Sequence, residues 1–238
     1  QVADRDRPLS ARVPLQVGSG GVENASIHLN PPLELAGRIR VDGGSSPGLG
    51  GVQIVLQRRD TAGGMFGPNP SAKAQPDGSF VIPNVTPDAY SLVFSGLPEG
   101  SYVKSARSND VDLLVHGLDL VSGGAGAMDI VISPNGATVT GTVLNDQQQP
   151  APGATVVLVP EEKERREQPH FYRSVVADSS GRFTIRGVAP GRYAAYSWEY
   201  VEAGAYFDPD FMRPLANRGE TFSVREGSQE ELKLRLIP

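Results

Sequence analysis

Midway through its second half the chain reads Ser180-Gly-Arg-Phe-Thr-Ile-Arg-Gly-Val-Ala-Pro-Gly-Arg-Tyr-Ala-Ala-Tyr196. A similar segment occurs earlier, as Asp77-Gly-Ser-Phe-Val-Ile-Pro-Asn-Val-Thr-Pro-Asp-Ala-Tyr-Ser-Leu92. Six residues of the earlier segment recur as identical residues 103 positions later, which indicates a tandem repeat. The pairs are Gly78 and Gly181, Phe80 and Phe183, Ile82 and Ile185, Val85 and Val188, Pro87 and Pro190, and Tyr90 and Tyr193.

The repeated segment has the pattern of a β-hairpin. In Phe183-Thr-Ile185, apolar residues alternate with a polar one, which is the period of a half-buried strand. The Val-x-Pro that follows places proline at the second position of a tight turn. A Ser-Gly or Asp-Gly pair before the phenylalanine marks another turn. We therefore expect strand, turn and strand, with the Phe, Ile, Val and Tyr side chains on the inner face.

Composition favours small all-β domains. The chain has 28 glycines and 20 prolines, and the short strand-like segments between them are typical of a β-sandwich or barrel. A length of 238 residues allows one to three domains, and the repeat sets the number at two. A domain of about a hundred residues buries roughly 60 to 70% of its unfolded surface, which is enough for its own core.

Charge and cysteine content exclude several function classes. The net charge of -5 argues against a nucleic-acid reader, which needs a basic face. No apolar run approaches the roughly 20 residues of a transmembrane helix. The absence of cysteine excludes disulfides, thiol chemistry and zinc sites built from cysteine. Because the chain begins at Gln1 without a visible signal peptide, we expect it to be a piece of a longer polypeptide.

The repeat divides the chain into three predicted parts. Residues 1–32 are the C-terminal remnant of a preceding repeat, and residues 33–134 and 135–238 are two complete modules. Pro31-Pro32 makes a stiff joint, and Pro134-Asn135-Gly136 is too short to be a loose tether, so limited relative motion is expected. The alternative for the remnant is an unrelated glycine-rich hairpin. The pairs that support the preceding repeat, and not the hairpin, are Val17 and Leu120, Gly21 and Gly124, and Ile27 and Ile130, each 103 residues apart.

Each module also has a divergent excursion. Asp60–Pro70 is apolar enough to pack on something, and the mixed-charge run Glu161–Glu167 is interpreted as a solvated loop. Later, Asp208-Pro209 has the pattern of an N-cap and a first-turn proline, and Asn217-Arg-Gly219 supplies a stop. We predict a short helix from Asp208 to Gly219 that forms a lid over one end of the second sandwich.

These motifs resemble the carboxypeptidase regulatory-like domains, a prealbumin-like family related to the B-type repeats of collagen adhesins. The resemblance implies an all-β fold of tandem seven-stranded Greek-key β-sandwiches, with one short helix in the second module. It covers both modules. The matching segments of the second are Val139-x-Gly-x-Val143, Pro150-x-x-Gly-Ala-x-Val156 and Gly181-x-Phe-x-Ile-x-x-Val-x-Pro-Gly-x-Tyr193.

The resemblance also implies a role. In such families the domain is non-catalytic and appended to other parts, and Trp198-Glu-x-Val-Glu-x-Gly-Ala-Tyr206 looks like segments of large acidobacterial exported proteins. We therefore expect a secreted, periplasmic or cell-surface location. The expected partners are other domains of the same polypeptide, with a polysaccharide or a cell-surface protein as a further candidate. No cofactor is predicted.

No catalytic residue is predicted. The three histidines, His28, His116 and His170, lie far apart in the sequence, although a triad is assembled in space. Gly44-Ser-Ser-Pro-Gly48 matches Gly-x-Ser-x-Gly, but a nucleophile elbow needs a strand-to-helix turn and this string lies between two strands. A hydrolase of unknown type is the third hypothesis.

Adhesin-type repeats can carry Lys–Asn isopeptide cross-links. Where that family places its reactive lysine, in the opening strand, this chain has Arg38 and Thr142. We therefore expect no cross-link at any of the four lysines, which are Lys73, Lys104, Lys163 and Lys233.

Four carboxylates near the predicted helix form an acidic patch. Hard oxygen ligands of this kind suit calcium. The chain has no Asp-x-Asp-x-Asp-Gly loop, and Asp208 already serves as a helix cap, so no metal site is predicted. The patch consists of Glu199, Glu202, Asp208 and Asp210.

The remaining candidate site is aromatic. Six of the sixteen aromatic residues lie between positions 196 and 211, and three of them share one strand face by the period of two. Beside carboxylates, such a face could stack a sugar ring. The favoured alternative is that the helix at 208–219 covers this face, which then belongs to the core. The candidate ligand-binding residues are Tyr196, Trp198, Tyr200, Glu199 and Glu202.

Two hypotheses lead. The first is a non-enzymatic array of β-sandwiches that acts as a structural or interaction part of a larger exported protein. The second is a carbohydrate-binding module that uses the aromatic residues around Trp198. What separates them is whether the face of Trp198 is open or covered.

Overall fold

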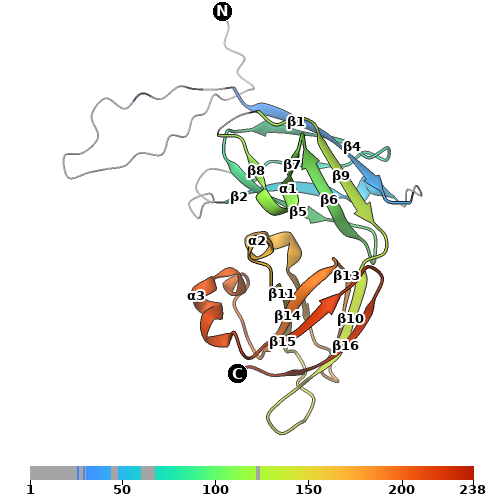
Figure 1. The fold of residues 1–238 in the computed structure, drawn as a ribbon, viewed down its shortest axis with the longest axis vertical. Coiled ribbons are helices and arrows are strands. Elements are labelled where there is room, and N and C mark those ends of the chain that lie inside the picture. Colours follow the sequence, from blue (N-terminus) through green and yellow to red (C-terminus); the bar gives the residue numbers. More distant parts are fainter. Residues whose placement is uncertain (1–25, 27–28, 30, 44–47, 60–67, 122–123) are drawn as a thin grey trace, which may run out of the picture.

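The computed structural model describes residues 26, 29, 31–43, 48–59, 68–121 and 124–238. They form two β-sandwiches, each of two sheets, drawn one above the other in Figure 1. The predicted remnant at 1–32 lies for the most part outside the described residues, as do His28, positions 44–47 and most of Asp60–Pro70. The boundaries 33–134 and 135–238 stay our proposal.

The first sandwich pairs a five-stranded sheet with a four-stranded one. The first sheet has the order β4-β1-β9-β6-β7, and the second has the order β3-β2-β5-β8. The strands are β1 (Leu33–Val41), β2 (Gln53–Arg58), β3 (Ser71–Lys73), β4 (Ser79–Val85), β5 (Ala89–Ser95), β6 (Tyr102–Ser108), β7 (Val111–Asp112), β8 (Leu118–Asp119) and β9 (Met128–Ser133), with short helices η1 (Leu49–Gly51) and α1 (Leu113–His116).

The second sandwich pairs the sheet β13-β10-β16 with the sheet β12-β11-β14-β15. Its described residues form seven strands, as predicted. They are β10 (Ala137–Leu144), β11 (Thr155–Pro160), β12 (Arg173–Val176), β13 (Arg182–Val188), β14 (Gly191–Trp198), β15 (Glu220–Val224) and β16 (Gln229–Arg235). Its helical turns are α2 (Lys163–Arg166), η3 (Pro169–Phe171), η4 (Ala205–Phe207), α3 (Pro209–Met212) and η5 (Arg213–Leu215).

The two sandwiches share one strand pairing. The first strand pairs antiparallel with the signature hairpin strand and parallel with the last strand, as β1 does with β4 and β9 and β10 does with β13 and β16. The first sandwich has nine described strands where seven were predicted, because the connection after β5 forms β6 and β7, and β6 pairs with β9.

A close contact explains why the opening motif contains glycine and the signature motif contains phenylalanine. Gly141 on β10 lies opposite Phe183 on β13. A Cβ atom on Gly141 would lie 2.7 Å from the Phe183 ring and 2.3 Å from the carbonyl oxygen of Leu232. Gly37 meets the Phe80 ring in the same way in the first sandwich. The two motifs are therefore the two sides of one contact.

The second sandwich has apolar side chains on both faces of the β11–β14 sheet. One face packs against β10, β13 and β16, and it includes Val156 and Tyr193. The opposite face carries a separate cluster that includes Val157 and Trp198, and the segment containing η4, α3 and η5 packs against it. This segment, labelled α3 in Figure 1, covers the face of Trp198, as the favoured alternative for the aromatic residues expected, and not one end of the sandwich.

The lid is less regular than the predicted single helix. Asp208 caps α3, because its carboxylate accepts a hydrogen bond of 2.8 Å from the Asp210 amide. The α-helix then ends at Met212 and continues as the 3-10 turn η5. Pro214 has no amide hydrogen for the next α-helical bond, which accounts for the change.

The run Glu161–Glu167 is not a simple solvated loop, so that interpretation was wrong. It contains the helical turn α2. Arg165 donates to the Pro190 carbonyl at 2.7 Å and Arg166 to the Pro160 carbonyl at 2.8 Å. The Arg165 guanidinium also lies 4.4 Å from the centre of the Phe171 ring. These bonds to backbone oxygens fix the turn on the sandwich.

Substituting Gly141 by alanine should destabilise the protein by about 1–3 kcal/mol, since the new methyl group meets a backbone carbonyl that cannot move alone. Urea unfolding measures the loss. The control is Gly124→Ala, where a Cβ atom would meet nothing within 4 Å. Equal stabilities for the two variants would contradict the contact as the source of the glycine requirement.

Candidate functional site

The predicted aromatic platform does not exist as one open face. Trp198 is 2% exposed and Tyr196 is 6% exposed, and their rings stack with centres 5.5 Å apart. Met212 and Leu215 of the lid pack against this cluster. Tyr200 is 81% exposed, because β14 ends at Trp198 and the alternation of the strand stops there. A sugar ring cannot reach the Trp198 face in this arrangement.

The carboxylates of the predicted patch are exposed and have separate roles. Asp208 caps α3, and Asp210 forms an ion pair with Arg213. Glu199 and Glu202 lie at the surface beyond the end of β14. In the part of the chain that the structure describes, no group of three or more His, Asp or Glu residues could hold a metal ion.

Trp198 fluorescence should be blue-shifted and unchanged by polysaccharides, because the ring lies beneath the lid. Emission spectra with and without a panel of glycans measure this for a single residue, since the chain has one tryptophan. Met212→Ser should shift the emission to the red by opening the cover. A red emission from the unmodified chain would contradict the burial.

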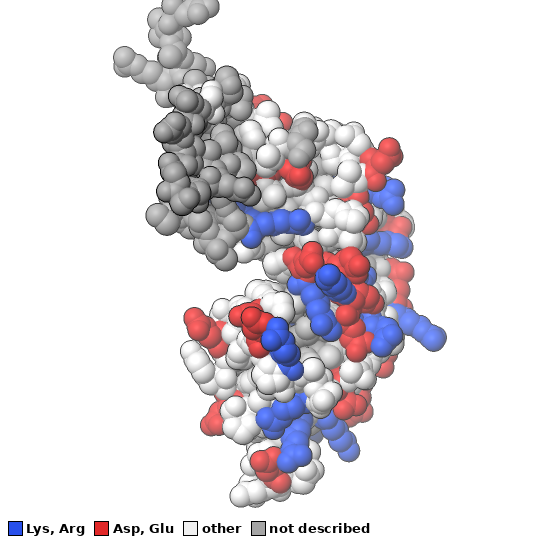
Figure 2. All heavy atoms as spheres, turned by 60° about the vertical axis from the view of Figure 1, so that its left-hand side comes forward, with Lys and Arg blue, Asp and Glu red and all other residues white. Residues whose placement is uncertain are grey.

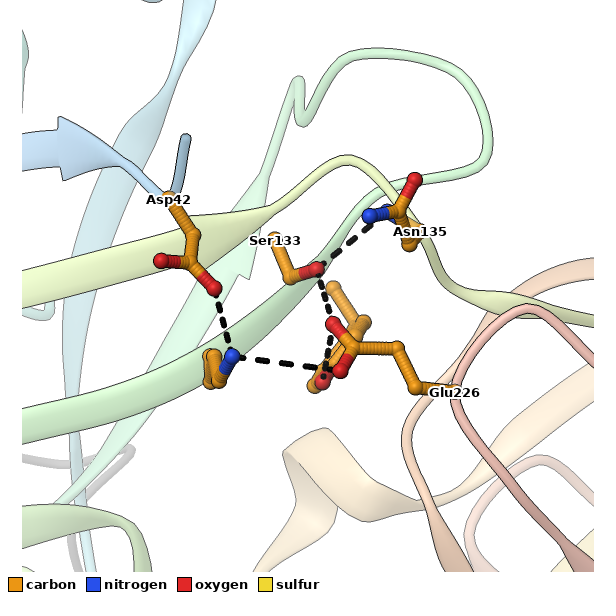
Figure 3. A network of polar contacts seen from close by, with 6 residues as sticks. Asp42, Ser133, Asn135 and Glu226 are labelled. Carbon is orange, nitrogen blue, oxygen red and sulfur yellow. Dashed lines mark hydrogen bonds and ion pairs between the residues drawn. The ribbon is translucent and has the colours of Figure 1, made fainter. Parts of the chain in front are cut away.

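The two sandwiches meet in a continuous set of contacts, which is the strongest candidate for a functional site. Figure 3 shows its polar centre. Glu226, in the turn between β15 and β16, accepts hydrogen bonds from the Ser133 hydroxyl at 2.5 Å and the Tyr102 hydroxyl at 3.2 Å. Ser133 ends the last strand of the first sandwich and Tyr102 begins β6. One carboxylate of the second sandwich therefore joins two strands of the first.

Lys104 extends this network. Its amine lies 2.5 Å from Asp42 and 3.8 Å from Glu226. The Asp42 bond raises the pKa of Lys104, and the Ser133 bond is the largest cause that lowers the pKa of Glu226. Near neutral pH the amine is therefore protonated, and Glu226 and Asp42 are ionised. A protonated, half-exposed amine is not a nucleophile, so the geometry favours an ion pair over an amide bond.

Glycines let the two backbones touch beside this network. The Gly136 amide donates to the Gly100 carbonyl at 2.9 Å. A Cβ atom on Gly136 would lie 2.5 Å from that carbonyl oxygen and 2.6 Å from the Gly187 Cα. A Cβ atom on Gly187 would lie 2.4 Å from the Ser101 carbonyl oxygen. The contact therefore leaves no room for a side chain at Gly136 or Gly187.

Two further bonds flank the glycine contact. Arg186 forms an ion pair of 2.7 Å with Glu99, and the fully buried Gln168 donates to the Val115 carbonyl at 2.9 Å. Together with Glu226 they spread the junction over the hairpin, the η3 segment and the last turn of the second sandwich.

A small cavity of about 40 Å³ lies between the sandwiches. Neither ring nitrogen of His170 has a hydrogen bond of good geometry to any described residue, although the nearby Leu92 backbone acts to raise its pKa. Burial lowers the pKa of His170 to about 3, and the charges of Arg173 and Arg165 act in the same direction. His170 is therefore neutral near pH 7. The lining residues are Phe94, Leu97, Tyr102, Val103, His170, Phe171, Arg173 and Ala189.

His116 and His170, the two histidines among the described residues, do not form a catalytic group. His116 is exposed at the end of α1, and His170 is half-buried in the junction. Neither has a hydrogen bond from its ring to a serine or a carboxylate among the described residues. The positions of these two residues supply no activated nucleophile.

Sequence reasoning missed the residues of this junction. Glu226 has no local signal, because its partners lie 93 and 124 residues away. Gly136 has a weak sequence signal, because a short Pro-Asn-Gly linker between two packed domains needs a close approach of their backbones. Predicting the role of Tyr102 would have required knowledge that the connection after β5 forms β6.

Comparison with known families supports the resemblance for the second sandwich. Residues 138–196 match the family described as carboxypeptidase regulatory-like domain. This range runs from β10 to β14 and contains the signature hairpin. Among proteins with curated descriptions, none matches the chain. No helix of the described residues is long and apolar enough to cross a membrane.

Solved structures with a similar arrangement have low sequence identity. A streptococcal ancillary pilin has 15% identity and a TM-score of 0.32, and the match covers all of this chain and 73% of that one. The shaft pilin SpaA from Lactobacillus rhamnosus GG has 12% identity and a TM-score of 0.29, covering 86% and 97%. Catechol 1,2-dioxygenase from Acinetobacter sp. ADP1 has 13% identity and a TM-score of 0.24, covering 42% and 52%. Because pilins and an enzyme occur together at these scores, the neighbours do not decide the function.

Acid should lower the free energy of unfolding, because His170 resists protonation in the folded protein. Its pKa of about 3 lies below the ordinary value near 6.5, so the unfolded chain takes up the proton first and stability falls as the pH drops below about 6.5. Between pH 6.5 and 5 the loss should reach up to about 2 kcal/mol. Urea unfolding of His170→Asn should show a smaller loss over this range. His116→Asn, at an exposed histidine, is the control, and an equal pH response in all three proteins would contradict the assignment.

Proposed function

We propose that the chain is a non-catalytic structural part of a larger exported protein, in which two β-sandwiches are held in a fixed relation. The observation that carries this proposal is the junction at Glu226, where one carboxylate is hydrogen-bonded to two strands of the neighbouring sandwich. A chain of independent binding domains would not need such a contact. The location and the parent protein are part of the proposal and are supported by the family resemblance.

The chemistry of the described residues agrees with a structural role. Lys104 is held as an ion pair, and His170 is neutral and enclosed between the sandwiches. On the face shown in Figure 2, blue and red side chains are interspersed over the described residues. We therefore propose that the partners are other domains of the same polypeptide.

Carbohydrate binding remains the second candidate, in a reduced form. The residues that could take part without movement of the lid are Tyr200, Glu199 and Glu202, which are exposed. Titration with polysaccharides, read from the amide spectrum of residues 199–207, tests it. We make no proposal of a hydrolase.

The two sandwiches should tumble as one body in solution. Nitrogen-15 relaxation measures the rotational correlation time of each, and the two values should agree. Gly136→Leu should separate them, because its side chain meets the Gly100 and Gly187 backbones. Gly124→Leu, in open space, is the control. Different correlation times in the unmodified chain would overturn the proposed function.

A further inference from the structure

A short motif occurs at the same place in both sandwiches. After β5 the first sandwich has Glu99-Gly-Ser-Tyr102-Val103, and after β14 the second has Glu202-Ala-Gly-Ala-Tyr206-Phe207. The second copy has one additional residue, an alanine. Both glycines are left-handed, with φ of 74° at Gly100 and 93° at Gly204. The agreement in sequence, position and backbone conformation indicates a repeated feature rather than a chance similarity.

In the first sandwich, each member of this motif contacts the second sandwich. Glu99 pairs with Arg186, and the Gly100 carbonyl accepts from the linker glycine Gly136. The Tyr102 hydroxyl donates to Glu226. Val103 lines the cavity beside His170. The motif is therefore the main docking surface that the first sandwich offers to its neighbour.

In the second sandwich, Glu202 and Phe207 are exposed, and Gly204 and Tyr206 are half-buried. Within the described residues, Glu202 has no ion pair and the Tyr206 hydroxyl has no hydrogen bond. The Gly204 carbonyl accepts one bond, from Phe207, which leaves a second lone pair. Phe207 is 41% exposed, and Tyr200, which takes the position of Leu97, is 81% exposed. The motif therefore has a carboxylate and a hydroxyl that can bond to a partner, and the described residues do not supply that partner.

The end of the last strand lies beside this surface. In the first sandwich, β9 ends at Ser133, next to Tyr102, and Pro134 leads into the second sandwich. In the second sandwich, Ile237 follows β16 and its carbonyl accepts from the Glu199 amide at 3.0 Å. Pro238 therefore takes the place that Pro134 has in the first sandwich.

We propose that residues 199–207 are a docking surface for a further β-sandwich of this type, joined in tandem at Pro238. Such a sandwich would present an arginine and a carboxylate where the second sandwich presents Arg186 and Glu226. The proposal rests on the structural function proposed above. The second copy of the motif continues into η4 rather than into a strand such as β6, so the contact is more aromatic than the first one, through Tyr200 and Phe207.

The test extends the whole chain by a second copy of residues 135–238 placed after Pro238, which reproduces the Pro134–Asn135 joint. Nitrogen-15 relaxation of the added sandwich should give the same correlation time as the first two. The double change Glu202→Gln and Tyr206→Phe should release it, as should Arg186→Gln in the added copy alone. The control is Glu220→Gln with Glu231→Gln, which alters two exposed carboxylates outside the motif and should leave it docked.

Every result decides the proposal. If the added sandwich tumbles independently when the motif is unmodified, the proposal is overturned. An added copy that stays unfolded would also count against the proposal, since docking onto residues 199–207 should stabilise the added sandwich. Failure of the proposed function would appear separately, as different correlation times for the first two sandwiches.

Discussion

In each sandwich a phenylalanine ring lies against a glycine that has no room for a side chain. At Gly141 a side chain would meet the Phe183 ring on β13 and the Leu232 carbonyl on β16. Both strands that flank β10 therefore lie too close for a side chain at this position. The contact positions the signature hairpin strand and the last strand relative to the first, and the remaining pairs follow from it. Overpacking a core in this way costs about 1–3 kcal/mol, a large share of the stability of a small domain.

The junction uses the same device for a different purpose. Gly136 and Gly187 bring two backbones together, and a carboxylate network lies beside them. Arg186–Glu99 and Lys104–Glu226 are exposed ion pairs, and exposed ion pairs contribute little to stability, so their strength does not hold the sandwiches together. The close backbone contact and the buried Gln168 resist separation, and the charged groups select one orientation. The hydrogen bonds of Glu226 therefore serve mainly to fix which strands of the first sandwich face the second, and less to stabilise the contact.

The fold was predictable from local patterns, and the junction was not. The period of two and the repeated Val-x-Pro turn identify strands without reference to distant residues, and Asp208-Pro209 identifies the start of α3. Tyr200 was misplaced because the alternation was extended past Trp198, where β14 ends. The Glu161–Glu167 run was misread because arginines that bond to backbone carbonyls look, in sequence, like solvated charges. Glu226 depends on partners about a hundred residues away, and no local pattern carries that information.

The parallel pairing of first and last strands has a mechanical meaning. β10 and β16 run side by side in the same direction over seven residue pairs, from Thr138 and Gln229 to Leu144 and Arg235. The chain therefore enters a sandwich at one end of this ladder and leaves it at the other. A pulling force along the polypeptide loads the evenly spaced hydrogen bonds together, in shear, instead of opening them one at a time as in a peeled hairpin. The first sandwich has the same geometry between β1 and β9, so tension passes through both along their strongest direction.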